Sequence, residues 1–167
     1  RLCRAERPQR GRLREFFQWN IDVIGAEGVL ADAECVFVAL DFLRQAGLGP
    51  QTIELRVNSR TIIAALLEQG GLEPARHDRV FAVMDKFDKL APDAFRAYAL
   101  EQGLSESDLG RVQEILAVAD LDQMASLVRT DVARAEFDRL KELADLLAAF
   151  GVGDYFTYRP AVVRGLA

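Results

Sequence analysis

The chain has 167 residues, of which 50% are hydrophobic and 28% are charged. This composition is typical of a globular protein with one domain or two small ones, and it excludes a low-complexity or fibrous chain. The formal net charge of −5 argues against nucleic-acid binding driven by overall charge, and no apolar run reaches the length of a membrane span.

The first 25 residues predict a β-hairpin that ends at Gly25. Six arginines fall within the first fourteen positions, and a turn containing Pro8 and Gly11 separates two extended segments. After the turn, even and odd positions differ in character. The even positions are polar or aromatic: Phe16, Gln18, Asn20 and Asp22. The odd positions are apolar: Phe17, Trp19, Ile21 and Val23. Because successive strand side chains face opposite sides, we expect Trp19 in the core and the first set in a ligand site.

The remaining elements follow from apolar spacing, caps and glycine stops. Helices are predicted over residues 31–46, 59–68, 76–89, 92–102, 109–118, 121–128 and 132–150. Strands are predicted over residues 52–57 and 155–163. Ser105 begins a Ser-x-x-Asp variant of the capping box, which fixes the start of the fifth helix.

This order predicts a mixed α/β (α+β) fold with an inserted all-helical domain. We expect the core to comprise residues 1–58 and 130–167, and the insertion to comprise residues 59–129. The chain opens without a methionine inside a predicted strand, so we expect a fragment of a larger protein. Cys3 and Cys35 are expected to be free thiols in a reducing cytoplasm, without a protein-bound metal.

The hairpin carries residue types suited to a nucleotide. Arg4 and Glu6 share one face; a guanidinium suits a phosphate oxygen, and a carboxylate can accept from an exocyclic amine. A cross-strand ion pair is the structural alternative for these two residues. Phe16 could stack on a base, although a lone phenylalanine is more often part of the core.

Gln18 and Asp22 predict a site for an ammonium group, because a carboxylate on a ligand-facing strand needs a compensating charge. A solvated edge strand is the alternative. Arg10, Arg12 and Arg14 could bind a triphosphate or an RNA backbone. The alternative is that these three side chains are solvated. The sole histidine, His77, lies in a helical stretch and is expected to be structural.

These residues resemble a known family. The run from Arg4 through Gln18, with Asp22 and Gly25 beyond it, is similar to motif 2 of histidyl-tRNA synthetases, which are class II aminoacyl-tRNA synthetases. Residues 150–152 and 162–167 resemble the start of the histidine-specific signature. Residues 57–60 and 85–89 are similar to the insertion domain of the archaeal and eukaryotic branch.

The resemblance implies a role for each matched residue. Arg4 would bind the α-phosphate of ATP, Glu6 the adenine amino group, and Phe16 would stack beneath adenine. Arg12 would contact histidine or the phosphates, while Gln18 and Asp22 would hold the histidine ammonium group. Arg164 would also contact histidine and stabilise charge at the reacting phosphate, so Arg4 and Arg164 are the expected catalytic pair.

The resemblance also implies substrates and partners. These are histidine, ATP with Mg²⁺ and tRNA(His), in a cytoplasmic enzyme whose full-length form is a homodimer. The candidates for RNA contacts are Arg10, Lys86, Lys89 and Arg96. The core would be part of the antiparallel sheet typical of class II synthetases.

Several family features are missing from the chain: motif 1, motif 3, the anticodon-binding domain and the Tyr-Tyr pair of the histidine signature. We therefore expect residues 1–167 alone to be inactive in aminoacylation. Two alternatives stay open. One is the synthetase-like regulatory subunit of ATP phosphoribosyltransferase, and the other is a synthetase-like domain that senses uncharged tRNA.

Overall fold

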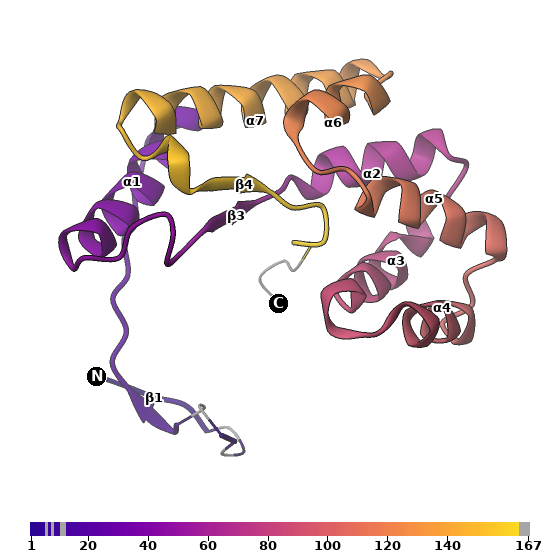
Figure 1. The fold of residues 1–167 in the computed structure, drawn as a ribbon, viewed down its shortest axis with the longest axis horizontal. Helices are drawn as coiled ribbons and strands as arrows, with labels where there is room; N and C mark the ends of the chain where they lie inside the picture. Colours follow the sequence, from indigo (N-terminus) through magenta and orange to yellow (C-terminus); the bar gives the residue numbers. More distant parts are fainter. Residues whose placement is uncertain (6, 8, 11–12, 164–167) are drawn as a thin grey trace.

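The computed structural model describes residues 1–5, 7, 9–10 and 13–163 (Figure 1). Its α-helices are α1 (Val29–Gln45), α2 (Arg60–Gln69), α3 (His77–Met84), α4 (Pro92–Glu101), α5 (Glu106–Leu116), α6 (Leu121–Leu127) and α7 (Asp131–Ala149). Its strands are β1 (Leu2–Cys3), β2 (Glu15–Phe16), β3 (Leu55–Val57) and β4 (Phe156–Tyr158). Single 3-10 turns occur at Pro74–Arg76, Phe87–Lys89 and Gly153–Tyr155. The predicted mixed fold is confirmed.

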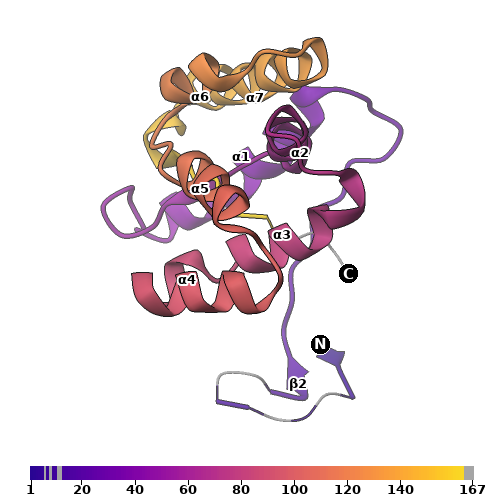
Figure 2. The ribbon, with the colours of Figure 1, turned by 90° about the vertical axis from the view of Figure 1, so that its right-hand side faces the viewer.

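The strands form two separate pairs. β1 and β2 are antiparallel, with Leu2 opposite Phe16, and this hairpin extends away from the helices in both ribbon views (Figures 1 and 2). β3 and β4 are parallel, with Leu55 opposite Phe156 and Val57 opposite Tyr158. A parallel pair needs a long crossover, and the segment from α2 to α7 provides it.

Helix α7 joins two apolar clusters. It runs above β3–β4 and α2 in Figure 1. Phe137 and Leu140 pack into the larger cluster, which includes side chains from α2 to α6, whereas Leu147 packs with Leu40 of α1 and with Tyr155. The helical block α2–α6 and the strand-bearing part thus share α7 as a common support. The predicted boundaries of the insertion, residues 59–129, stay a prediction.

Two helices begin at serine caps, and α5 begins three residues before the predicted position 109. The Ser59 hydroxyl accepts a hydrogen bond from the Ile62 amide, 3.4 Å away, at the start of α2. At α5 the capping box is confirmed: the Asp108 amide donates to the Ser105 hydroxyl at 3.1 Å, and the Ser105 amide donates to the Asp108 carboxylate at 2.9 Å. Such caps satisfy amides that have no intrahelical partner.

Three elements are shorter than predicted. The predicted helix over residues 76–89 ends at Met84 and gives way to the 3-10 turn Phe87–Lys89. The predicted strand over residues 52–57 begins only at Leu55, because the amides of Thr52 and Ile53 both donate to the Gly49 carbonyl in a turn. The predicted strand over residues 155–163 ends at Tyr158, where Pro160 lacks an amide hydrogen and the Val162 amide bonds back to Arg159.

The predicted strand through residues 16–23 was wrong beyond Phe16. Residues 17–27 have no regular secondary structure, apart from a bend at Gly25, because β2 pairs with β1 over two residues only. Trp19 is not in the core: its side chain is 56% exposed and packs with its ring centroid 5.1 Å from that of Phe42. Without a ladder of partner strands, the alternation of residues 16–23 does not fix one face on the core.

Candidate functional site

The hairpin brings Arg4 and Phe16 together. The Arg4 amide donates to the Arg14 carbonyl at 2.9 Å, and the Arg4 guanidinium carbon lies 5.0 Å from the centre of the Phe16 ring. This is a cation–π contact. Phe16 is half-buried and belongs to neither apolar cluster, so the expectation that a lone phenylalanine is core does not hold here. A positive charge and an aromatic face therefore lie together, a pairing that suits a phosphorylated aromatic ligand.

A groove of about 700 Å³ lies between residues 19–22, helix α1 and the start of β3. Its walls are mainly apolar side chains, namely Trp19, Ile21, Val36, Ala39, Leu40, Leu43, Ile53 and Leu55. Asn20, Asp22 and Glu54 are the polar groups in this lining that can orient a ligand. A volume of this size is within the range of small-molecule sites.

Asp22 is available to a ligand in this groove. Within the described part of the chain, its carboxylate makes no hydrogen bond or ion pair, whereas Glu54 pairs with Arg56. The Gln18 amide donates to the Asn20 side chain at 2.5 Å, which places Gln18 beside the groove without making it part of the lining. An ammonium group in the groove would meet the Asp22 charge.

Three predicted site residues, Glu6, Arg12 and Arg164, lie outside the described residues. The chain leading to position 164 is nevertheless well fixed. The Asn58 side-chain amide donates to the carbonyls of Pro160 and Val162, each at 3.1 Å, and Val163 is buried in the larger cluster. The end of β3 therefore sets the path of the backbone up to residue 163.

Three predicted RNA contacts lie on the helical block α2–α6, and each of them is ion-paired. Lys89 and Lys86 lie 2.8 Å and 3.8 Å from the Asp85 carboxylate, and Arg96 lies 2.5 Å from Glu106. Arg10 is exposed in the turn of the hairpin. A cation that is already ion-paired presents less net charge to a phosphate than an unpaired cation does.

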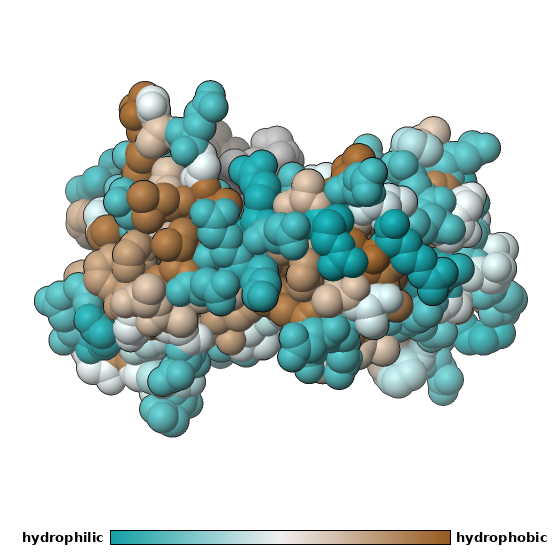
Figure 3. Space-filling model, turned by 90° about the horizontal axis from the view of Figure 1, so that it is seen from above, coloured by the Kyte–Doolittle hydropathy of each residue, from teal (hydrophilic) through white to brown (hydrophobic). Residues whose placement is uncertain are grey.

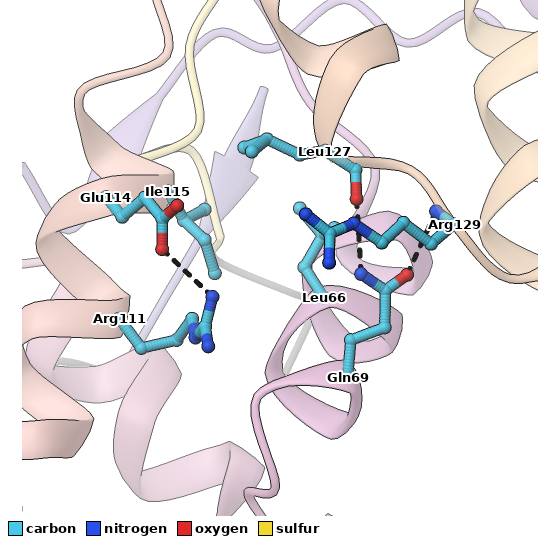
Figure 4. Close-up of a pocket in the computed structure, with 7 residues that line it drawn as sticks. All are labelled: Leu66, Gln69, Arg111, Glu114, Ile115, Leu127 and Arg129. Atoms are coloured by element: carbon cyan, nitrogen blue, oxygen red, sulfur yellow. Dashed lines mark hydrogen bonds and ion pairs between the residues drawn. The ribbon is translucent and has the colours of Figure 1, made fainter.

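Two arginines not identified from the sequence lie around a second, smaller pocket. This pocket of about 160 Å³ is bordered by α2, α5 and the turn between α6 and α7, and Arg111 and Arg129 are part of its lining (Figure 4). They are 18 positions apart in the sequence and stand on different elements. No local periodicity marks such a pair, and only the fold reveals it.

His77 is buried, as expected for a structural residue. It is 8% exposed, and its ring lies edge-on to Phe81 with 6.1 Å between centroids. Its Nε2 atom has no hydrogen-bond partner among the described residues. Cys3 and Cys35 are free thiols. In the described ranges no three His, Cys, Asp or Glu side chains gather as a metal site, and no described helix has both the length and the apolarity of a membrane span.

Comparisons with known proteins agree with the residue pattern. A family model described as "Histidyl-tRNA synthetase" matches residues 1–167. The chain is 32% identical over 164 residues to "Histidine--tRNA ligase, chloroplastic/mitochondrial" of Arabidopsis thaliana, covering 98% of the chain and 33% of that protein. It is 33% identical over 163 residues to "Histidine--tRNA ligase" of Natronomonas pharaonis, covering 98% of the chain and 38% of that protein. The chain thus spans about a third of these relatives.

Solved structures show the same fold at low identity. The histidyl-tRNA synthetase from Nostoc sp. PCC 7120 matches with a TM-score of 0.72 and 14% identity, covering 84% of this chain and 35% of that one. An "ATP phosphoribosyltransferase regulatory subunit/histidyl-tRNA synthetase" from Bacillus halodurans C matches with a TM-score of 0.66 and 19% identity, covering 83% and 36%.

Proposed function

Because the chain belongs to the histidyl-tRNA synthetase family, we propose that the whole protein activates histidine with ATP and then transfers it to tRNA(His). The contact of Arg4 with Phe16, 5.0 Å from guanidinium carbon to ring centre, is the observation that carries this proposal. It joins a phosphate-binding charge and a base-stacking ring on one hairpin, in the residue pattern that resembles motif 2.

The first reaction would form histidyl-adenylate. The histidine carboxylate attacks the α-phosphorus of ATP, a new carboxyl–phosphate bond forms, and pyrophosphate leaves with the electrons of the broken bond. Arg4 and Arg164 would stabilise the charge on the α-phosphate oxygens, and Mg²⁺ would arrive with ATP as part of the substrate. Positioning and electrostatics account for catalysis of this kind.

The remaining residues would fix the two substrates. Phe16 would stack beneath adenine. Because the Arg4 guanidinium also contacts the Phe16 ring, either Arg4 lies along the edge of that ring or adenine stacks on the face of the ring opposite Arg4. Glu6 would accept from the adenine amino group, and Arg12 would contact histidine or the phosphates. Asp22, with Gln18 nearby, would hold the histidine ammonium in the groove beside α1, where Asp22 has no described partner.

The larger organisation is part of the same proposal. Residues 59–129 would be the helical insertion, residues 1–58 and 130–167 would belong to the catalytic core, and the complete enzyme would be a cytoplasmic homodimer. Since the chain spans about a third of its relatives, residues 1–167 alone are expected not to charge tRNA. Charging by this piece at the rate of the whole protein would refute that expectation.

A second candidate is a regulatory function without aminoacylation. This candidate is supported by the match to a Bacillus halodurans structure, which is named both as a phosphoribosyltransferase regulatory subunit and as a synthetase. A tRNA sensor is the third alternative. ATP–pyrophosphate exchange by the whole protein, with each amino acid in turn, separates them: exchange with histidine alone supports the synthetase, and no exchange from folded protein supports a binding function.

A further inference from the structure

The pocket bordered by α2, α5 and the α6–α7 turn has two cationic groups that converge. Arg111 reaches into it from α5, and Arg129 reaches in from the turn on the other side (Figure 4). Gln69 of α2 and Glu114 of α5 provide its other polar side chains, and Leu66, Ile115 and Leu127 provide apolar walls. A small pocket with two guanidinium groups is suited to an oxyanion.

Local packing holds this arrangement in place. The Gln69 side chain donates to the Leu127 carbonyl and accepts from the Arg129 amide, both at 3.1 Å, so it fixes the turn that carries Arg129. The Arg111 side chain lies over Gly70, where a Cβ would come within 2.7 Å of the Arg111 Nε atom. The absence of a side chain at position 70 therefore makes room for Arg111.

The charge balance of the pocket is positive. Arg111 is partly compensated, since its guanidinium lies 2.9 Å from the Glu114 carboxylate in an exposed pair. The Arg129 guanidinium makes no hydrogen bond or ion pair with the other described residues. Lys86, Lys89 and Arg96 differ in this respect, because each lies within 4 Å of a carboxylate.

On the premise of the proposed function, we propose that Arg111 and Arg129 bind a phosphodiester group of the tRNA backbone in this pocket. A volume of about 160 Å³ is too small for a nucleotide or a cofactor, for which roughly 300–1,000 Å³ is usual, but it accommodates a single phosphate group. Both arginines are exposed, so the remainder of the ligand lies outside the pocket, as in a polymer. Phosphate contacts of this kind orient RNA without reading its sequence.

The test uses the whole enzyme and an unmodified transcript of tRNA(His). The variants are Arg129→Ala and the double variant Arg111→Ala/Arg129→Ala. The control is Arg139→Ala, which removes an exposed arginine of α7 that lies 3.6 Å from the Glu136 carboxylate. Two quantities are measured for each protein: the KM for tRNA in aminoacylation over a range of salt concentrations, and the KM values for histidine and ATP in pyrophosphate exchange.

We expect the double variant to raise the KM for tRNA about tenfold and to lower the slope of log KM against log salt by about one for each arginine. Exchange with histidine should be unchanged, since α5 lies toward the opposite end of the molecule from α1, which borders the proposed histidine groove (Figure 1). Arg139→Ala, which removes one ion-paired positive charge outside the pocket, should have a smaller effect. Gly70→Ala, which keeps both charges but displaces Arg111, should raise the KM for tRNA by an intermediate factor.

Two results would overturn the proposal: a KM for tRNA within twofold of wild type in the double variant, or a rise in Arg139→Ala equal to that in Arg129→Ala. If the double variant also lost exchange activity, the decision would rest on Arg129→Ala, which removes no side-chain bond to the described residues. A wild-type protein that fails to exchange with histidine would instead refute the synthetase function itself, before any variant is compared.

Discussion

The Tyr158 hydroxyl donates a hydrogen bond to the Asn58 side-chain oxygen across the parallel pair β3–β4, at 3.1 Å. The amide nitrogen of the same Asn58 donates to the carbonyls of Pro160 and Val162. Burial raises the pKa of the Tyr158 hydroxyl, which keeps it protonated as the donor. One side chain at the end of β3 therefore fixes the backbone that leads to residue 164.

Asn58→Asp should destabilise the chain by about 2–3 kcal/mol at pH 7. The carboxylate can still accept from Tyr158, but it cannot donate to the two carbonyls, which are left facing a negative charge. Urea unfolding of the purified chain measures the free energy. The exposed Asn20→Asp is the control, and a loss at Asn58 no larger than at Asn20 would contradict the role of this side chain.

The capping box of α5 predicts an acid-dependent loss of stability. Burial alone would raise the pKa of Asp108, but the Ser105 amide and hydroxyl and the Arg76 guanidinium hold that pKa below its usual value. The stabilisation is therefore present above about pH 4 and is lost as the pH falls through the lower pKa of the folded state.

Asp108→Asn should cost about 1 kcal/mol at neutral pH. The difference from wild type should shrink as the pH is lowered below about 4. Unfolding curves at several pH values measure it, with Asp138→Asn on the exposed side of α7 as control. A difference at Asp108 that does not depend on pH would show that the carboxylate charge is not involved.

Phe16→Ala should weaken ATP binding and leave histidine binding nearly unchanged. Removal of a base-stacking ring costs about 1–3 kcal/mol, so a rise of at least roughly fivefold in the KM for ATP is expected. Pyrophosphate exchange by the whole protein provides both KM values. The adjacent Phe17, 87% exposed, is the matched control. Equal effects at the two positions would argue against stacking on Phe16.

The single tryptophan reports on the apolar face beside α1. Figure 3 shows apolar side chains gathered at the end of the molecule where α1 lies, and the exposed ones on α1 include Leu30, Val38 and Phe42. We predict that Trp19 emission is red-shifted and readily quenched by acrylamide in residues 1–167, and blue-shifted and protected in a form of the whole protein whose only tryptophan is Trp19. Equal quenching in both would mean that the remainder of the protein leaves this face uncovered.

The helices could be predicted from the sequence because their signals are local. The helix predicted from Ser59 begins at Arg60, and Ser105 caps α5 as its Ser-x-x-Asp pattern predicts, although α5 begins at Glu106 and not at residue 109. The apolar stripe of α7 gives the longest helix within about a residue. The parallel pairing of β3 with β4 could not be predicted, since it joins strands about 100 positions apart. The prediction that Trp19 lies in the core was also wrong, because it assumed a strand. In the described part of the chain, residues 17–24 have no hydrogen-bonded partner strand to hold them in that conformation.

The candidate site, like the fold, could be predicted only in part from the sequence. The motif predicted that Arg4 and Phe16 belong to one ligand site, whereas their direct contact is a finding of the structure. The structure also places Asp22 in a groove. Arg111 and Arg129 could not be found from the sequence, because their convergence depends on how α5 packs beside the α6–α7 turn. The roles of Glu6, Arg12 and Arg164 stay predictions.

The most direct test of histidine activation is pyrophosphate exchange by the whole protein carrying Asp22→Asn. The control is Glu27→Gln, which removes one exposed negative charge from the same segment. We predict exchange with histidine in the wild type and in Glu27→Gln. In Asp22→Asn the KM for histidine should rise at least about tenfold, because the ammonium group loses its counter-charge. An unchanged KM for histidine in Asp22→Asn would contradict the assignment of this groove to the amino acid.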